Sequence, residues 1–449
     1  MSATLASSGP AVQPVATTET LPEAVDIAII GGGIVGVSTA LWLARRGVSV
    51  ALFEKGRIAA EQSSRNWGWV RVAGRDLREL PLMQRSTTLW QEMTRTVEAE
   101  TGYRRAGIVY AQKTEQARGR HSRWAEHARA LGIQATLLSA DEVAARTPGL
   151  TRSCFGALYT PDDGRAEPQM AVPAMADAAI RAGAHLLQHC AARSIDMSAG
   201  RVSGVVTEKG RVQASTVIVA GGSWSRLLLS GVGTTLPQLK VLSTAYRTGP
   251  LDAGIDSAMS FSEFALRKRL DGGYTIASSA ISAAEIVPDS IRFFRQFLPA
   301  YLMERKGMRL RLGRAFIDEA LNWHPGSPDK RSIYEAVRIL DPKPDLQTVA
   351  KVQASIAAAL PSFAGVPIVQ SWAGMIDTTP DAIPVISRLD AVPGLIIGTG
   401  FAGHGFGIGP GAGELLADMA TGTTSAVDPS AFRFSRFTEG SKLDLQAWL

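Results

Sequence analysis

The feature that most constrains this chain is a glycine-rich turn near its N-terminus, Gly31-Gly32-Gly33-Ile34-Val35-Gly36. A short apolar run, residues 25–30, precedes the turn, and residues 37–46 continue with apolar residues at helical spacing. A second apolar run, residues 48–53, ends at Glu54. Apolar runs of this length suit strands that are buried on both faces of a parallel sheet. The segment therefore predicts one complete strand–helix–strand unit.

The spacing of the three glycines, G-x-G-x-x-G, predicts a dinucleotide site in this unit. The first glycine allows a tight turn, the second lets the backbone approach a diphosphate, and the third lets helix and strand pack closely. Glu54 can accept hydrogen bonds from a ribose diol, and a carboxylate there repels the 2′-phosphate of NADP. A diphosphate is favoured at the helix N-terminus by unpaired N–H groups and the helix dipole. The residues predicted to bind the dinucleotide here are Gly31, Gly33, Ile34, Val35, Gly36, Glu54 and Lys55.

Composition excludes several classes of protein. The chain has 449 residues, of which 45% are hydrophobic, and 47 Lys+Arg against 41 Asp+Glu leave a net charge of +6. These values are ordinary for a globular protein and argue against a disordered or small disulfide-stapled chain. The densest basic run, residues 305–314, is interpreted as the solvated face of a strand or helix. A charge of +6 over this length does not predict nucleic-acid binding.

The cysteines and the N-terminal segment bear on the compartment. Only Cys154 and Cys190 are present, and neither lies in a C-x-x-C pair, so we expect no disulfide and no metal site. No apolar run is long enough to cross a bilayer, and the N-terminus lacks the basic region of a signal peptide. Residues 1–24 are rich in Ala, Thr, Ser and Pro and are predicted to form a disordered tail. The expected location is the cytoplasm.

Two later segments favour FAD over NAD. The apolar run 216–220 leads into Gly221 and Trp224, where the backbone could lie close to a dinucleotide. The segment 398–414, GTGFAGHGFGIGPGAGE, is a second glycine-rich strand-to-helix junction, whose helix N-terminus could stabilise negative charge on a reduced flavin. A nicotinamide enzyme does not need this second junction. The final helix is expected over about residues 413–419, after a loop at 400–413.

The order of these motifs resembles a known family. The N-terminal DIAIIGGGIVGVSTALWLARRGVSVALFEK, the central DGRAEPQM and VIVAGGSWS, and the C-terminal TTPDAIPVI and GFAGHGFGIGPGAGE look like the D-amino-acid-oxidase-like (DAO) superfamily of FAD-dependent oxidoreductases. The sarcosine oxidase, glycine oxidase and D-amino-acid dehydrogenase type is the most similar subgroup. The resemblance implies oxidation of the C–N bond of an amino acid or N-substituted amine, by hydride transfer to flavin N5, to an imine that hydrolyses.

The resemblance also implies the fold class, α/β (α+β), with a Rossmann-like FAD-binding domain and an interleaved antiparallel-sheet substrate domain. We expect the FAD-binding domain over residues 25–79, 160–235 and 365–449, and the substrate-binding domain over 80–159 and 236–364. The further residues that the family motifs assign to FAD are Ser63, Ser64, Gly403, His404, Gly405 and Phe406. His404 is interpreted as a structural residue of its loop and not as a catalytic base.

Departures from the family pattern predict how flavin is held and reoxidised. Monomeric sarcosine oxidases attach FAD to a cysteine where this chain has residues 372–375, Trp-Ala-Gly-Met, so the resemblance implies non-covalent FAD here. Those enzymes carry lysines where Gly407 and, by alignment, Thr275 stand. A positive charge near the flavin stabilises developing superoxide. Its absence favours a dehydrogenase, although both O2 and a quinone-type acceptor stay open as partners.

The substrate side is predicted around the segment 63–71, SSRNWGWVR. Arg71 is the candidate for binding a substrate carboxylate, because a guanidinium can bind it with two parallel hydrogen bonds; the alternative is an arginine paired with Asp76 or Glu79. Asp377 is expected to point to the site, where it could meet a distal amine. The remaining residues predicted in the substrate pocket are Arg65, Trp67, Trp69 and Thr275.

Two other functions remain open at this stage. An aromatic-ring FAD monooxygenase shares the N-terminal fingerprint, and Asp163-Gly164 mimics an Asp-Gly element of that class, but the C-terminal GHGFGIG segment does not belong to it. A flavin subunit of a heteromeric opine- or hydroxyproline-type dehydrogenase is the second alternative. In that case the basic run 305–314 could contact a partner subunit.

Overall fold

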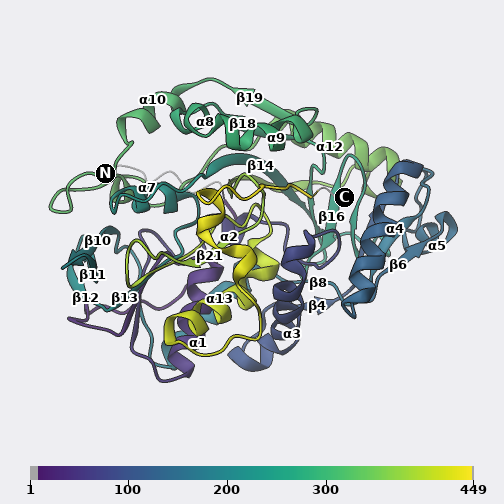
Figure 1. The fold of residues 1–449 in the computed structure, drawn as a ribbon. Helices are drawn as coiled ribbons and strands as arrows, with labels where there is room; N and C mark the ends of the chain where they lie inside the picture. The colour runs from purple at the N-terminus through teal and green to yellow at the C-terminus, as the bar shows by residue number, and fades with distance from the viewer. Residues whose placement is uncertain (1–8, 447–449) are drawn as a thin grey trace, which may run out of the picture.

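A six-stranded sheet forms one half of the molecule, which the computed structural model describes for residues 9–446 (Figure 1). Its strand order is β21-β22-β13-β1-β2-β9, and every neighbouring pair is parallel except β21 with β22. The central strand β1 has four fully buried residues, as expected for a strand covered on both faces. The strands are β1 (Ile27–Ile30), β2 (Val50–Phe53), β9 (His185–Leu187), β13 (Thr216–Val219), β21 (Val385–Arg388) and β22 (Leu395–Thr399).

Four helices pack together on this sheet: α1 (Ile34–Arg45), α3 (Leu80–Val97), α6 (Pro168–Arg181) and α13 (Gly405–Thr421). Helix α1 lies against both α6 and α13, and α13 also packs on α3. The predicted Rossmann-like unit is confirmed, with α1 following the glycine turn directly. The final helix is longer than predicted, because it begins at Gly405 and not near residue 413.

Close helix packing explains why a glycine-rich run can be helical here. A Cβ at Gly409 would lie 2.9 Å from Ile34, and one at Gly411 would lie 2.9 Å from the Leu82 carbonyl. These positions therefore keep α13 close to its neighbours on α1 and α3. The apparent loop of glycines is a packing surface, and the propensity cost of glycine in a helix is offset by buried contacts.

A ten-stranded, mostly antiparallel sheet forms the other half, as the interleaved substrate domain predicts. Nine strands follow the order β19-β18-β14-β17-β16-β15-β5-β7-β6, and β20 pairs with β14. The pairs β15–β5 and β18–β19 are parallel. The strands are β5 (Ile108–Ala111), β6 (Thr136–Leu138), β7 (Ala157–Thr160), β14 (Leu239–Thr248), β15 (Ala258–Ser260), β16 (Ala265–Lys268), β17 (Tyr274–Ala277), β18 (Ser282–Glu285), β19 (Met308–Arg311) and β20 (Ile368–Thr378).

Two segments cross the predicted domain boundaries. Strand β20 belongs to the ten-stranded sheet although residues 365–378 were assigned to the FAD-binding domain. Helix α3 packs on α13 although residues 80–97 were assigned to the substrate domain. Both differences arise because long-range pairing decides which sheet or helix layer a segment joins, and that pairing is not visible in local sequence.

Shorter elements complete the fold. Two three-stranded sheets contain β10 (Ala192–Ser198), β11 (Arg201–Thr207) and β12 (Gly210–Gln213), and β3 (Trp69–Val70), β8 (Gly164–Arg165) and β4 (Arg104–Arg105). The other α-helices are α2 (Gln62–Arg65), α4 (Glu115–Ala130), α5 (Ala140–Arg146), α7 (Ser225–Ser230), α8 (Pro288–Arg292), α9 (Phe294–Glu304), α10 (Arg314–Leu321), α11 (Ile333–Ala336) and α12 (Leu346–Ala359). Within residues 9–446, no helix is both long and apolar enough to span a bilayer.

The N-terminal segment differs from the predicted disordered tail over residues 9–24. The Gln13 amide donates to the Gln169 carbonyl at 3.0 Å, and the Thr18 amide donates to the Leu186 carbonyl at 2.7 Å. Val12 and Val15 pack against the hydrophobic core. The segment lacks secondary-structure periodicity because it is a single extended strap whose partners all lie elsewhere in the chain. Residues 1–8 lie outside the described part.

Candidate active site

A cavity of about 390 Å³ extends from the glycine turn after β1 to the two tryptophans of the 63–71 segment. It is lined by residues of both large sheets, including β1, β20 and β22. Most predicted site residues meet here, although they come from five separate stretches of sequence. The predicted residues that line the cavity are Gly31, Gly33, Ile34, Val35, Glu54, Lys55, Ser63, Arg65, Trp67, Trp69, Arg71, Gly221, Trp224, Asp377, Gly403, His404, Gly405 and Phe406.

The glycine turn is built for a close backbone approach. Gly31 has φ +113°, and a Cβ there would collide with the Ala220 carbonyl. Gly36 does not line the cavity; a Cβ there would collide with the Gly31 carbonyl, which fits the packing role predicted for the third glycine. The Ser63 hydroxyl accepts a hydrogen bond of 2.9 Å from the Ile34 amide, at the first turn of α1. Ser63 therefore supports the helix N-terminus that faces the cavity.

Glu54 and Lys55 close the dinucleotide end of the cavity. The Glu54 carboxylate accepts hydrogen bonds from the Gly32 amide at 2.8 Å and the Gly56 amide at 2.7 Å, and burial raises its pKa. Lys55 donates to Glu61 at 2.5 Å and to two backbone carbonyls, and its ammonium lies 4.5 Å from the Trp224 ring centroid. Lys55 therefore connects the segment after β2 to Glu61 and to residues 337–338. Each carboxylate oxygen of Glu54 accepts one hydrogen bond, so the carboxylate keeps acceptor capacity.

The N-terminus of α13 and a buried ionic cluster form a second wall. His404 precedes the helix, and its Nδ1 lies 3.6 Å from Glu79 Oε2. Arg75 donates to the His404 carbonyl at 3.0 Å and to Glu79 at 3.3 Å. Burial, together with the nearby positive charge of Arg71, lowers the pKa of His404 to about 4. His404 is therefore neutral at pH 7, and its predicted structural role stays a prediction.

Asp377 lies in the cavity wall, and one of its carboxylate oxygens is held by protein groups. Its Oδ2 accepts hydrogen bonds from the Gly400 amide at 2.8 Å, from Gln238 at 2.9 Å and from Thr399 at 3.1 Å. Its side chain is buried, and burial raises its pKa. Asp377 therefore holds the loop that leads from β22 to α13, and its contact with a distal amine stays a prediction.

Three other predicted residues also have structural partners. Ser64 is buried outside the cavity, where its hydroxyl donates to the Glu61 carbonyl. Thr275 also lies outside the cavity, and its hydroxyl accepts from Arg269 at 3.2 Å, so it is not a substrate-pocket residue. Arg65 lines the cavity but forms an ion pair of 2.7 Å with Asp341. These contacts depend on tertiary neighbours that local sequence does not reveal.

The substrate end of the cavity is lined by aromatic side chains and by the guanidinium of Arg71. The rings of Trp67 and Trp69 meet edge-on at 5.4 Å, and Trp69 meets Tyr110 at 5.8 Å. The Arg71 guanidinium lies 5.8 Å from the Tyr110 ring centroid and donates to the Ala73 carbonyl. The alternative interpretation paired Arg71 with Asp76 or Glu79. In the structure, Asp76 forms an ion pair with Arg78, and Glu79 forms one with Arg75.

Sequence reasoning missed several residues of this cavity. Tyr110 lies on β5 and reaches the site only because β5 joins the ten-stranded sheet through β15, so no local pattern could have identified it. Gln62 and Asn66 also line the cavity. Both flank the predicted serines within the same short segment, and this adjacency was an available signal.

Two acidic residues of the DGRAEPQM segment hold the backbone of the segment that forms the substrate end of the cavity. Asp163 accepts hydrogen bonds from the Val72 amide at 2.6 Å and the Ala73 amide at 3.1 Å, which fixes the backbone that follows Arg71. Burial raises the pKa of Asp163 to about 6. Because Asp163 binds backbone here and lies outside the cavity, it does not contact a cofactor as the Asp-Gly element of the monooxygenase alternative would require.

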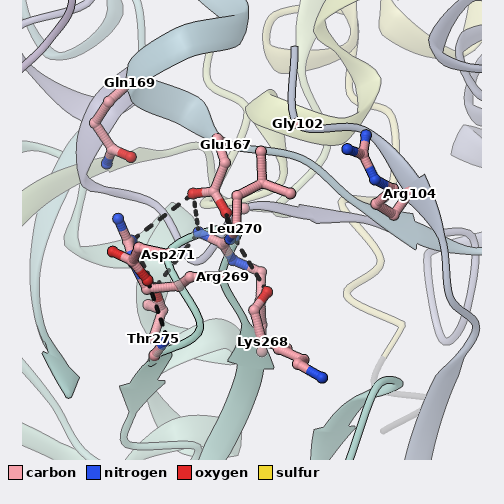
Figure 2. A network of polar contacts seen from close by, with 12 residues as sticks. Gly102, Arg104, Glu167, Gln169, Lys268, Arg269, Leu270, Asp271 and Thr275 are labelled. Carbon is pink, nitrogen blue, oxygen red and sulfur yellow. Dashed lines mark hydrogen bonds and ion pairs between the residues drawn. The ribbon is translucent and has the colours of Figure 1, made fainter. Parts of the chain in front are cut away.

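Glu167 is the second acid, and it lies at the centre of the network in Figure 2. Arg267 donates to both of its oxygens at 2.7 and 3.1 Å, and the Leu270 amide donates at 2.9 Å. The Nε of Arg267 also donates to the Trp67 carbonyl at 2.6 Å. The tryptophan wall is therefore connected to a buried ion pair between the end of β8 and strand β16.

The cavity fits FAD on the residues that are present. The turn at Gly31 leaves no space for a side chain, the α1 and α13 N-termini both line the cavity, and Glu54 has acceptor capacity toward a ribose. The wall formed by residues 374–376 contains no cysteine, and neither Cys154 nor Cys190 lines the cavity. The backbone amide of Gly33 would bind a phosphate at this turn, while the Ile34 amide already donates to Ser63.

The parallel sheet, the glycine turn and the second helix N-terminus together define a dinucleotide-binding oxidoreductase. A family model described as DAO, FAD dependent oxidoreductase, matches residues 26–419. The chain belongs to this family of FAD-dependent oxidoreductases, and the resemblance inferred from its motifs is confirmed.

Individual relatives are diverse in the activities that they are named for. The chain is 22% identical to sarcosine oxidase subunit beta of Arthrobacter sp. over 93% of its own length and 92% of the relative. It is 24% identical to N-methyl-L-tryptophan oxidase of Salmonella dublin, over 92% and 99%. Among solved structures, L-amino acid deaminase from Proteus myxofaciens in complex with anthranilate superposes with a TM-score of 0.92 at 30% identity, covering 96% of this chain and 98% of that one.

Proposed function

We propose that this protein oxidises the C–N bond of an α-amino acid that carries an apolar or aromatic side chain. Bound FAD would supply the acceptor for the hydride that leaves the substrate α-carbon. The amine loses a proton, the C–N bond becomes an imine, and water hydrolyses the imine to an oxo acid and an amine or ammonia. A dry, aromatic pocket favours the neutral amine that this step needs.

One observation carries the proposal: at the aromatic end of the cavity, Arg71 forms no ion pair with a described carboxylate, and the other cavity-lining arginine without one, Arg57, lies near Glu54 at the dinucleotide end. Arg65 is paired with Asp341 and Arg75 with Glu79, whereas no carboxylate within the described residues lies within ion-pair distance of Arg71. Its neighbours are the aromatic rings of Tyr110 and, through Tyr110, Trp69. A guanidinium in this setting is suited to a carboxylate, with the substrate side chain against the aromatic wall.

The names of the relatives support the same substrate class. The structural relative at 30% identity is named an L-amino acid deaminase, and several sequence relatives are named for amino acids or N-methylated derivatives. We further infer a quinone-type acceptor in place of O2, because Gly407, which lines the cavity, stands where oxidase relatives carry a lysine. We also propose a cytoplasmic location, because Cys154 and Cys190 are free thiols, which fits a reducing compartment.

The test compares an amino acid with its decarboxylated amine by anaerobic flavin bleaching. Arg71→Ala should lower kcat/KM for the acid by roughly 30- to 1000-fold, because a buried charge-assisted pair is worth about 2–4 kcal/mol. Arg71→Lys should restore part of the loss. Arg95→Ala is the matched control, because Arg95 is 81% exposed and only pairs with Glu92 at the surface. An equal loss for acid and bare amine would show that Arg71 is structural.

A further inference from the structure

An outer layer, residues 286–321, lies at the β19 end of the ten-stranded sheet and contains α8, α9, strand β19 and α10 (Figure 1). One side of this layer is firmly attached to the body. Strand β18 pairs with both β14 and β19, and Phe293 and Phe297 are buried. Asp289 on α8 forms a salt bridge of 2.6 Å with Arg226 of α7. The layer is therefore a fixed part of the fold.

The outer layer also exposes many large apolar side chains. Nine of the fifteen exposed large hydrophobic residues in the described part of the chain fall within 291–321: Ile291, Phe294, Tyr301, Leu302, Met303, Leu310, Leu312, Ile317 and Leu321. Leu312 is 74% exposed and Leu321 is 80% exposed. Scattered exposed apolar residues are normal, but a concentration of this kind marks an interaction surface.

Helix α10 is the clearest example of exposed apolar side chains in this layer. Its apolar residues Phe316, Ile317, Ala320 and Leu321 lie at helical spacing on one face, while Asp318 and Glu319 lie on another. No residue of this helix is buried. An amphipathic helix is normally stabilised by burying its apolar face, but here Phe316 is half-buried while Ile317 and Leu321 are 59% and 80% exposed, so much of this face is uncovered by residues 9–446.

The outer layer is also basic. Residues 286–321 contain seven basic residues and four acidic ones, a net charge of +3 against +6 for the whole chain: Arg292, Arg295, Arg305, Lys306, Arg309, Arg311 and Arg314 against Asp289, Glu304, Asp318 and Glu319. Asp289 is already paired with Arg226. Four of the basic residues, Arg292, Arg295, Arg305 and Lys306, form no ion pair with any described residue, although Arg292 contacts Thr235 and two aromatic rings.

We propose that this outer layer binds the surface of an anionic lipid bilayer. Exposed apolar side chains interleaved with lysines and arginines are the pattern of interfacial segments, whose apolar residues enter the acyl boundary while cations contact headgroup phosphates. A second copy of the chain is the less favourable occupant, because a two-fold contact would bring together two surfaces that each carry a net charge of +3. The proposal does not depend on the substrate, because binding can be measured without turnover.

The test is sedimentation of the FAD-loaded full chain with vesicles. Phosphatidylcholine vesicles with about 30% phosphatidylglycerol should pellet the protein, pure phosphatidylcholine should bind it much less, and high salt should release it. Replacing Arg305 and Lys306 by Glu should weaken partitioning by about 25-fold or more, since each cation near the surface contributes roughly fivefold. Leu312→Ser with Leu321→Ser should weaken it by about 10-fold or more.

Phe155→Ser is the matched control, because Phe155 is 51% exposed but lies outside the outer layer. Turnover of a soluble substrate by each variant verifies that it is folded. The proposal is overturned if the chain binds neither vesicle, or if the outer-layer variants bind as well as the control. It is also overturned if Leu312→Ser with Leu321→Ser converts a dimer to a monomer without changing vesicle binding, because the occupant is then a second copy.

Discussion

Replacing Glu167 by Gln tests whether the buried ion pair supports the substrate end of the cavity. Glu167 and Arg267 are 4% and 1% exposed, and they form two hydrogen bonds with each other. Glutamine keeps the size of the side chain but leaves the Arg267 charge without its counter-charge. Breaking one side of a buried pair costs about 3–5 kcal/mol, so the free energy of unfolding of Glu167→Gln should fall by that amount.

The loss should have a characteristic pH dependence. Burial alone would raise the pKa of Glu167, but the charges of Arg267 and Arg269 outweigh it, and the net shift is downward from 4.5. A carboxyl group with a lowered pKa contributes stability above its unfolded pKa and loses it as pH falls through the folded value. Wild type and Glu167→Gln should therefore differ fully at pH 7 and converge progressively below about pH 4.5.

Urea unfolding followed by tryptophan and flavin fluorescence measures the effect. Glu263→Gln is the control, because Glu263 pairs with Lys113 and Arg152 at the surface and should cost less than about 1 kcal/mol. Because Arg267 also holds the Trp67 carbonyl, Glu167→Gln should raise KM for the amino acid at pH 7. Equal losses for both variants, or a Glu167→Gln loss that persists at pH 3, would refute the reasoning.

Three further predictions concern the cofactor and pH. FAD should be released intact by acid denaturation, since no cysteine lines the cavity; flavin absorbance that stays with the precipitated polypeptide would contradict this. Reduced enzyme should react faster with a quinone or dye than with O2 in stopped-flow experiments, and an O2 rate equal to the best acceptor would identify an oxidase. Because burial holds the pKa of His404 near 4, below its ordinary 6.5, stability should fall as pH drops from 6.5 to 4, by up to about 3 kcal/mol. His404→Asn should flatten this decline in thermal-melt measurements, and an unchanged slope would exclude His404 as its source.

The dinucleotide half of the fold was predictable because its signals are local. Strand, glycine turn, helix and Glu54 occupy 28 consecutive residues, 27–54, and each residue type has a direct backbone or hydrogen-bonding reason to be there. Where the interacting residues are close together in the sequence, the structure could be predicted from the sequence alone.

The differences from prediction have another physical origin. Ser64 and Thr275 were predicted in the site from family motifs and alignment, but both lie outside the cavity, and each side chain is bound by a partner that the tertiary structure supplies. A strand alternates its faces at every residue, so a register known only to within one residue cannot say which side chain enters a cavity. Tyr110 was missed for the complementary reason, since β5 reaches the site through a sheet contact with β15.

The arrangement of charge around Arg71 explains how the segment 67–73 can be held rigidly and still bind an anionic ligand. Asp163 fixes the two backbone amides after Arg71, and Glu167 acts through Arg267 on the carbonyl of Trp67. Both acids therefore act behind the loop, on backbone groups, and neither neutralises the guanidinium in front. A carboxylate placed beside Arg71 would hold the same loop as firmly but would occupy the group that a substrate acid needs. The aromatic end of this cavity is suited to an anionic ligand because the two acids hold the backbone while Arg71 forms no ion pair.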